Sequence, residues 1–167
     1  LNKYGPDYER NKQRILDKID LMEASFLTTA PEALNFISKK DNCFFIPNPS
    51  DSSFETLNNF NKSCNVDVFF ALSHGVHRGK LKSGKVDDRI TFLNKLQSIT
   101  KNTKFDIYGI NKIQPIWADH YFKTIENAKM GLNLSRGNAI KYYSSDRITQ
   151  IIGNGLVCLI DEKTKYQ

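Results

Sequence analysis

The chain has few cysteines, and the three it has follow no spacing typical of a metal site. Cys43, Cys64 and Cys158 lie far apart in the 167 residues. An odd number without a regular framework excludes a disulfide-rich secreted scaffold and favours a reducing compartment, so we predict a cytoplasmic protein. No apolar run approaches the roughly 18 residues that a membrane-spanning helix needs, and no secretory signal opens the chain. Leu1 rather than Met comes first, which indicates a fragment of a longer protein.

The sequence also lacks internal repeats, low-complexity tracts, a Walker loop and a G-x-G-x-x-G turn. Acidic residues are in deficit, with 18 against 24 basic residues and a net charge of +6. Such an excess suits nucleic acid, an anionic membrane surface or a phosphate-bearing ligand. No RNP-like strand and no recognition-helix pattern accompanies it, which argues against nucleic acid.

An alternation of apolar and amphipathic segments begins at Val66. We predict strands over 66–73, 104–109, 130–134 and 156–160, and helices over 87–100, 118–128 and 142–152. The first of these strands is a near-continuous apolar run, as a central parallel strand requires. The order βαβαβαβ predicts an α/β, Rossmann-like parallel sheet with helices on both faces. In the last helix we expect Ile148, Ile151 and Ile152 to face inward, and Asn154 and Gly155 to form a left-handed cap.

The first sixty residues read as shorter elements. We predict helices over 6–24 and 31–39 and strands over 25–29 and 43–46. Residues 50–65 are rich in Ser, Asn and Asp, which fits a linker with one short helical turn.

A loop rich in glycine and basic residues follows the strongest strand. Between Gly75 and Lys85 it contains three glycines and four Lys or Arg residues. Glycine allows a close backbone approach to a phosphate, and the cations would neutralise it. A solvated, flexible basic loop is the alternative. His74 and His77 are three residues apart without a third ligand nearby, so we predict no metal site.

The stretch from Lys129 to Asp161 carries a resemblance to a known family. Residues 133–136 read Asn-Leu-Ser-Arg, residues 145–150 read Ser-Asp-Arg-Ile-Thr-Gln, and Gly155 precedes an apolar strand. This order resembles the donor-binding half of group 1 glycosyltransferases with the two-domain GT-B fold, in particular the spore-maturation-type branch. The acidic residue that holds the nucleotide ribose in that family is Gln150 here, and its amide is a weaker partner than a carboxylate.

The resemblance implies a domain organisation and a reaction. Residues 1–60 would be the tail of an acceptor-side domain with its linker, with packing onto the main domain left open, and residues 61–167 a nucleotide-sugar-binding, Rossmann-like domain. The reaction would be hexosyl transfer from a nucleotide sugar to the hydroxyl of an acceptor glycan or glycolipid, as in polysaccharide biosynthesis. The partner would be the missing acceptor domain of the same protein, and peripheral attachment to a membrane stays open. No catalytic residue, no metal and no cofactor other than the donor substrate is implied, and the fragment alone would be weakly active or inactive.

The same resemblance assigns donor contacts. Arg78 and Lys85, with Lys80 as a rival, would hold the diphosphate, and Gln150 the ribose. The full set of predicted donor-binding residues is Gly75, Arg78, Lys80, Lys85, Asn133, Ser135, Arg136, Ser144, Ser145, Arg147 and Gln150. The alternative function is a basic Rossmann-like module that binds nucleotides or nucleic acid without catalysis.

Overall fold

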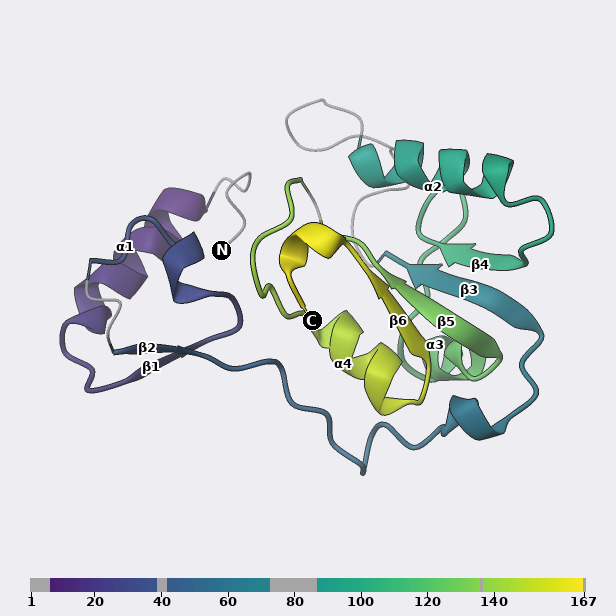
Figure 1. Cartoon of the computed structure of the whole chain (residues 1–167), viewed down its shortest axis with the longest axis horizontal. Coiled ribbons are helices and arrows are strands. Elements are labelled where there is room, and N and C mark those ends of the chain that lie inside the picture. Colours follow the sequence, from purple (N-terminus) through teal and green to yellow (C-terminus); the bar gives the residue numbers. More distant parts are fainter. Residues whose placement is uncertain (1–6, 39–41, 73–86, 136, 167) are drawn as a thin grey trace. The chain divides into compact units, whose positions relative to one another are not determined.

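A computed structural model describes residues 7–38, 42–72, 87–135 and 137–166 (Figure 1). The chain divides into two compact units. The first contains Leu1–Asn48, Ile140–Ser145 and Lys163–Gln167, and the second contains Pro49–Ala139 and Asp146–Glu162.

The second unit is a four-stranded sheet in which every recorded pairing is parallel. Its elements in chain order are β3 (Val66–Ala71), α2 (Asp88–Ile99), β4 (Phe105–Tyr108), α3 (Ala118–Ile125), β5 (Ala128–Asn133), α4 (Asp146–Gly153) and β6 (Val157–Ile160). The strand order across the sheet is β4-β3-β5-β6. The α/β class with a parallel, helix-flanked sheet is therefore confirmed.

Helices cover both faces of this sheet (Figure 1). On one face Phe70 and Leu132 pack with Leu93 of α2. On the other, Phe69 packs in a core with Ile125 of α3 and Ile151 of α4. Because Phe69 and Phe70 are both buried on opposite faces, β3 reads as an unbroken apolar run rather than an alternating one.

The last helix is shorter than predicted. It begins at Asp146, not at Tyr142, because Tyr142 has a positive φ of 53°. The N–H of Ser144 also donates to the carbonyl of Thr28 at 2.7 Å, which holds this segment outside the helix. Ile148 and Ile151 face inward as expected, but Ile152 is 58% exposed, so that part of the prediction was wrong.

Glycines fix both the packing and the end of α4. A Cβ on Gly131 of β5 would lie 2.4 Å from a side-chain carbon of Ile151, so only glycine lets the helix approach the strand this closely. Gly155 has a φ of 80°, which confirms the predicted left-handed cap. Its N–H donates to the carbonyl of Ile152.

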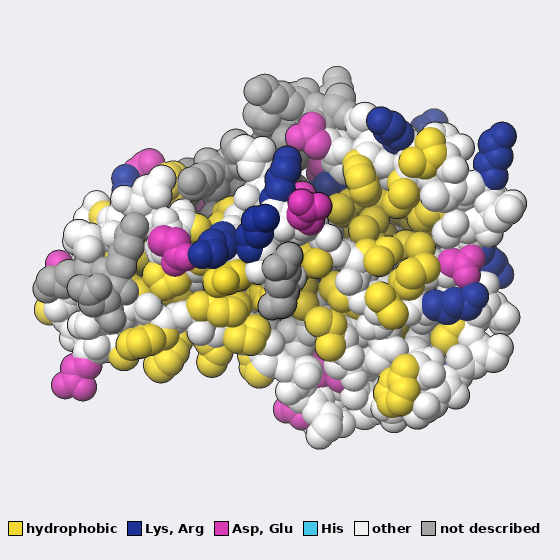
Figure 2. Space-filling view, in the orientation of Figure 1, with side chains coloured by type: hydrophobic (Ala, Val, Ile, Leu, Met, Phe, Trp, Pro, Cys, Tyr) yellow, Lys and Arg dark blue, Asp and Glu magenta, His cyan; other side chains and the backbone are white. Residues whose placement is uncertain are grey.

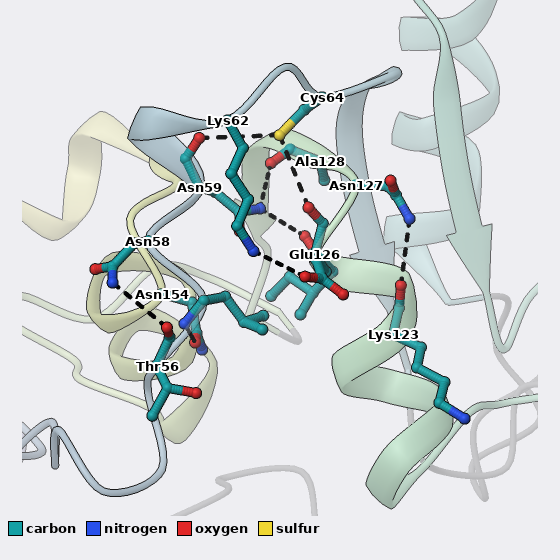
Figure 3. Close-up of polar contacts among 12 residues, drawn as sticks. Thr56, Asn58, Asn59, Lys62, Cys64, Lys123, Glu126, Asn127, Ala128 and Asn154 are labelled. Atoms are coloured by element: carbon teal, nitrogen blue, oxygen red, sulfur yellow. Dashed lines mark hydrogen bonds and ion pairs between the residues drawn. The ribbon is translucent and has the colours of Figure 1, made fainter.

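Residues 49–65 belong to the second unit and pack against its sheet through buried amides (Figure 3). The Asn59 side-chain amide donates to the carbonyls of Ile125 and Ala128, each at 2.8 Å. The Asn59 N–H donates to the carbonyl of Asn154, whose own side-chain oxygen accepts from the N–H of Leu57. The predicted short helical turn is the 3-10 turn η2 (Asn59–Asn61). This segment is thus fastened to the end of the sheet where β3 and β5 begin.

The first unit holds α1 (Tyr8–Ile19), β1 (Ser25–Leu27), the 3-10 turn η1 (Pro31–Ala33) and β2 (Cys43–Phe45). β1 and β2 pair in parallel over a small core that includes Ile19, Leu34 and Ile37. The predicted helix over 31–39 was wrong, because Leu34 leaves the helical region after one turn of 3-10 hydrogen bonds. A further 3-10 turn, η4 (Glu162–Thr164), ends the described elements.

Candidate functional site

The order of the sheet creates a switch point at the carboxyl ends of β3 and β5. From β3 the chain passes through α2 to β4 on one side and then through α3 to β5 on the other side. The connection after β3 leads to β4 and the connection after β5 leads to β6, so the connections from these two neighbouring strands leave in opposite directions. In such sheets ligands bind in the crevice outside this point. β3 ends at Ala71 and β5 at Asn133, so both strand ends lie at the same edge.

Arg147 links the two strands at this edge. It lies in the first turn of α4, and its Nη1 donates to the Asn133 side-chain oxygen at 3.3 Å and to the Leu134 carbonyl at 3.1 Å. Its guanidinium carbon lies 5.3 Å from the ring centroid of Phe70 in β3. One half-buried cation therefore contacts the end of β5 and the end of β3 together.

Asn133 positions that arginine. Its side chain is only 3% exposed, and its carboxamide oxygen accepts the Arg147 hydrogen bond. A buried acceptor with one favoured direction limits the rotamers that the long arginine can adopt. The described geometry gives Asn133 the role of holding Arg147.

The charge of Arg147 also acts on the buried groups around it. Burial raises the pKa of Tyr121 to about 12, and the positive charge of Arg147 opposes part of that increase. Burial raises the pKa of the Cys158 thiol as well, with Arg147 again opposing. Both groups are therefore neutral at physiological pH. The Tyr121 ring packs edge-on against Phe69, with ring centroids 5.4 Å apart.

Sequence reasoning missed one aromatic side chain near this edge. Trp117 follows the irregular segment after β4, directly precedes α3 and is 59% exposed. Its neighbour Ala118 has a φ of 47°, and Asn111 and Lys112 have values of 51° and 67°. Non-glycine residues seldom adopt this region, and such strain concentrates at binding sites. The available signal was a tryptophan at the carboxyl end of a parallel strand, in a segment without periodicity.

The predicted donor-binding residues fall into three groups. The structure brings together Asn133 and Arg147, with Ser135 two residues beyond β5 and a half-buried Gln150 on the next turn of α4. Ser144 and Ser145 belong to the first unit, where the Ser144 hydroxyl accepts from the N–H of Asn48 at 3.0 Å. The residues that lie outside the described part of the chain are Gly75, Arg78, Lys80, Lys85 and Arg136.

Two searches of the described residues found nothing. Within residues 7–38, 42–72, 87–135 and 137–166, no group of three or more His, Cys, Asp or Glu side chains could hold a metal ion. Over the same described ranges, no helix has the length and apolar character needed to cross a membrane.

A comparison with protein families gives one match. Residues 89–167, from the first turn of α2 to the end of the chain, match a family model described as "Glycosyl transferase-like". The match supports a glycosyltransferase family. It covers slightly less than half of the chain and includes β5, Arg147 and the cap at Gly155. No curated protein and no solved structure matches the chain.

Proposed function

We propose that this chain binds a nucleotide-sugar donor at the carboxyl edge of its sheet, for transfer of the sugar to an acceptor hydroxyl. The observation that carries the proposal is the position of Arg147, at the switch point and inside the glycosyl transferase-like segment. The GT-B class, the spore-maturation-type branch and hexosyl transfer from a nucleotide diphosphate sugar are parts of the same proposal.

In this proposal Arg147 contacts the donor diphosphate. Its guanidinium is permanently charged, and its planar fork of N–H donors matches the geometry of phosphate oxygens. The first turn of α4 adds the positive end of a helix dipole at the same place. Asn133 is a positioning residue for Arg147, and Arg78 and Lys85 remain sequence-based candidates for the same diphosphate.

Two further contacts complete the proposed donor site. Gln150 lies three residues after Arg147 on α4, on nearly the same side of the helix, and its amide can donate to or accept from a ribose hydroxyl. The exposed indole of Trp117 offers a flat surface on which a nucleobase could stack. Ser135 follows β5 and is available to the sugar. Ser144, Ser145 and Arg136 keep their sequence-based assignments as donor contacts, whereas Asn133 acts through Arg147.

The acceptor side belongs to a partner in this proposal. In the first unit, Phe26 of β1 and Phe44 of β2 are 67% and 49% exposed, with ring centroids 6.0 Å apart, and Ile46 is 45% exposed. Figure 2 depicts hydrophobic side chains at the surface over β1 and β2, at the lower left. Parallel sheets are normally covered on both faces, so this bare face supports a missing acceptor-side domain that packs on it.

Calorimetric titration of the full chain with nucleotide diphosphates, nucleotide sugars and short oligonucleotides tests the proposal. We expect binding of one nucleotide diphosphate and its sugar conjugate, with a modest dependence on salt. Binding of oligonucleotides alone, with a steep salt dependence, would support the nucleic-acid-binding alternative and refute donor binding. A silent titration with all three classes would also refute it.

A further inference from the structure

Helix α2 carries large apolar side chains beyond those that face the core. Ile90, Leu93 and Leu96 pack in the core of the sheet. Phe92 and Ile99 are 47% and 67% exposed. Seven residues separate these two, which is close to two full turns, so they share one exposed, outer stripe that runs beside the core-facing Leu96.

The surroundings of this outer stripe are basic. Residues 89–105 contain four Lys or Arg residues and no Asp or Glu. Arg89 is engaged by the buried carboxylate of Asp87 at 2.6 Å. In contrast, the exposed Lys95 and Lys101 form no ion pair with any residue in the described part of the chain. Figure 2 shows hydrophobic and basic side chains side by side over α2, at the upper right.

An acidic residue at the amino end of α2 confines the basic part of this surface to the rest of the helix. Asp88 is exposed one turn before Phe92, at the amino end of the same side of the helix. The cationic part is therefore the carboxyl-terminal half of α2 and the turn that follows it. There Ile99, the most exposed apolar side chain of the helix, lies between Lys95 and Lys101 in sequence.

The chemistry of this surface selects its partner. We propose that the outer face of α2 and the turn after it, defined by Phe92, Lys95, Ile99 and Lys101, binds the surface of an anionic phospholipid bilayer. The apolar side chains enter the headgroup boundary, and the lysine stems lie along it with their ammonium groups toward the lipid phosphates. Nucleic acid offers no apolar surface for Ile99, and a peptide helix prefers a groove to the convex face of a single helix. Donor binding at the sheet edge is not required for this interaction.

Vesicle sedimentation with the full chain tests the proposal. We expect binding to phosphatidylcholine vesicles that contain phosphatidylserine, weakened by salt, and much less binding to pure phosphatidylcholine. Lys95→Gln and Lys101→Gln should each lower the partition coefficient about fivefold. Phe92→Ser combined with Ile99→Ser should lower it about tenfold or more. These side chains lie outside the core, so thermal unfolding of the variants should match that of the parent chain.

The matched controls remove one exposed apolar side chain and one exposed lysine from helices other than α2. Ile152 of α4 is 58% exposed and Lys123 of α3 is exposed, so Ile152→Ser and Lys123→Gln should leave vesicle binding unchanged. Equal binding to both kinds of vesicle, no binding to either, or the same loss in the control variants would overturn the proposal. So would capture of an acidic helical peptide or of RNA by a chain that ignores the vesicles.

Discussion

Replacing Arg147 with alanine should weaken donor binding more than any other single change among the described residues. The substitution removes a guanidinium that donates to Asn133 and to the Leu134 carbonyl and lies 5.3 Å from the Phe70 ring. In the proposed complex it also removes the cation that faces the diphosphate. A hydrogen bond to a charged group is worth about 1.5–3 kcal/mol, which corresponds to an affinity loss of about ten- to hundredfold.

The same change should also lower stability. Two hydrogen bonds at about 0.5–1.5 kcal/mol each and one cation–π contact at about 0.5–1 kcal/mol predict a loss of about 1.5–4 kcal/mol in the free energy of unfolding. Arg147→Gln separates the two effects, because an amide can still donate to the Leu134 carbonyl but carries no charge. We expect this variant to keep much of the stability and to lose most of the diphosphate affinity.

Isothermal titration calorimetry with a nucleoside diphosphate, at two salt concentrations, measures the affinity, and urea unfolding measures the stability. The matched control is Lys62→Gln, which removes one cation from residues 49–65, away from the site; Lys62 pairs with Glu126 at 2.8 Å. If only long-range attraction by net charge mattered, Arg147→Gln and Lys62→Gln would lose the same affinity for the nucleoside diphosphate. Equal affinities for Arg147→Gln, Lys62→Gln and the parent chain would refute a diphosphate contact by Arg147.

Other expected outcomes can be checked with the same assays. Gln150→Ala should weaken a ribonucleotide more than its deoxyribose counterpart, by about 1 kcal/mol, and equal losses would assign Gln150 to the helix surface. Arg78→Ala and Lys85→Ala should each weaken diphosphate binding by about 1–3 kcal/mol, and unchanged affinity in both would exclude the basic loop from the site. Asn59→Ala should cost about 2–3 kcal/mol in urea unfolding, because the carbonyls of Ile125 and Ala128 lose their donor. The chain alone should turn over a donor poorly, since closure on an acceptor domain completes such sites; rapid transfer would contradict this.

Much of the sheet could be predicted because its signals are local. The apolar run from Val66 to Leu72 needs no tertiary information to be recognised as a buried strand. Asp87 before α2 is a side-chain cap, and it accepts the N–H of Arg89 as such residues do. Gly155 marked the end of α4 correctly because few other residues adopt a positive φ without strain.

The predictions of element boundaries were wrong where contacts with residues far away in the sequence determine the local structure. The sequence around Tyr142 does not indicate that Ser144 will form hydrogen bonds with Thr28 and Asn48. Those two hydrogen bonds keep α4 from starting earlier. The composition of residues 50–65 predicts a linker because Ser and Asn are common in loops. In the fold, Asn59 of this segment satisfies carbonyls that lie 66 and 69 residues away, which composition does not indicate. Local composition cannot reveal which backbone groups will lack partners.

The candidate site was predictable in outline for a topological reason. Parallel strands joined by right-handed crossovers bring all their carboxyl ends to one edge, so Asn133 and the residues after β3 had to share it. The partner of Asn133 was not predictable, because Arg147 is 14 residues away and its rotamer depends on Phe70. Trp117 was missed because an exposed tryptophan without periodicity resembles any loop residue.

The boundary between the two units falls directly before the helix that carries Arg147. The chain passes from the first unit to the second between Ser145 and Asp146, at the residue where α4 begins. Ser144 is bound to Thr28 and Asn48 on one side of this boundary, and Arg147 contacts Asn133 on the other. Only Ser145 and Asp146 separate these two anchored residues. Residues 144–147, which the sequence predicts as one turn of a helix, are therefore divided between the two units.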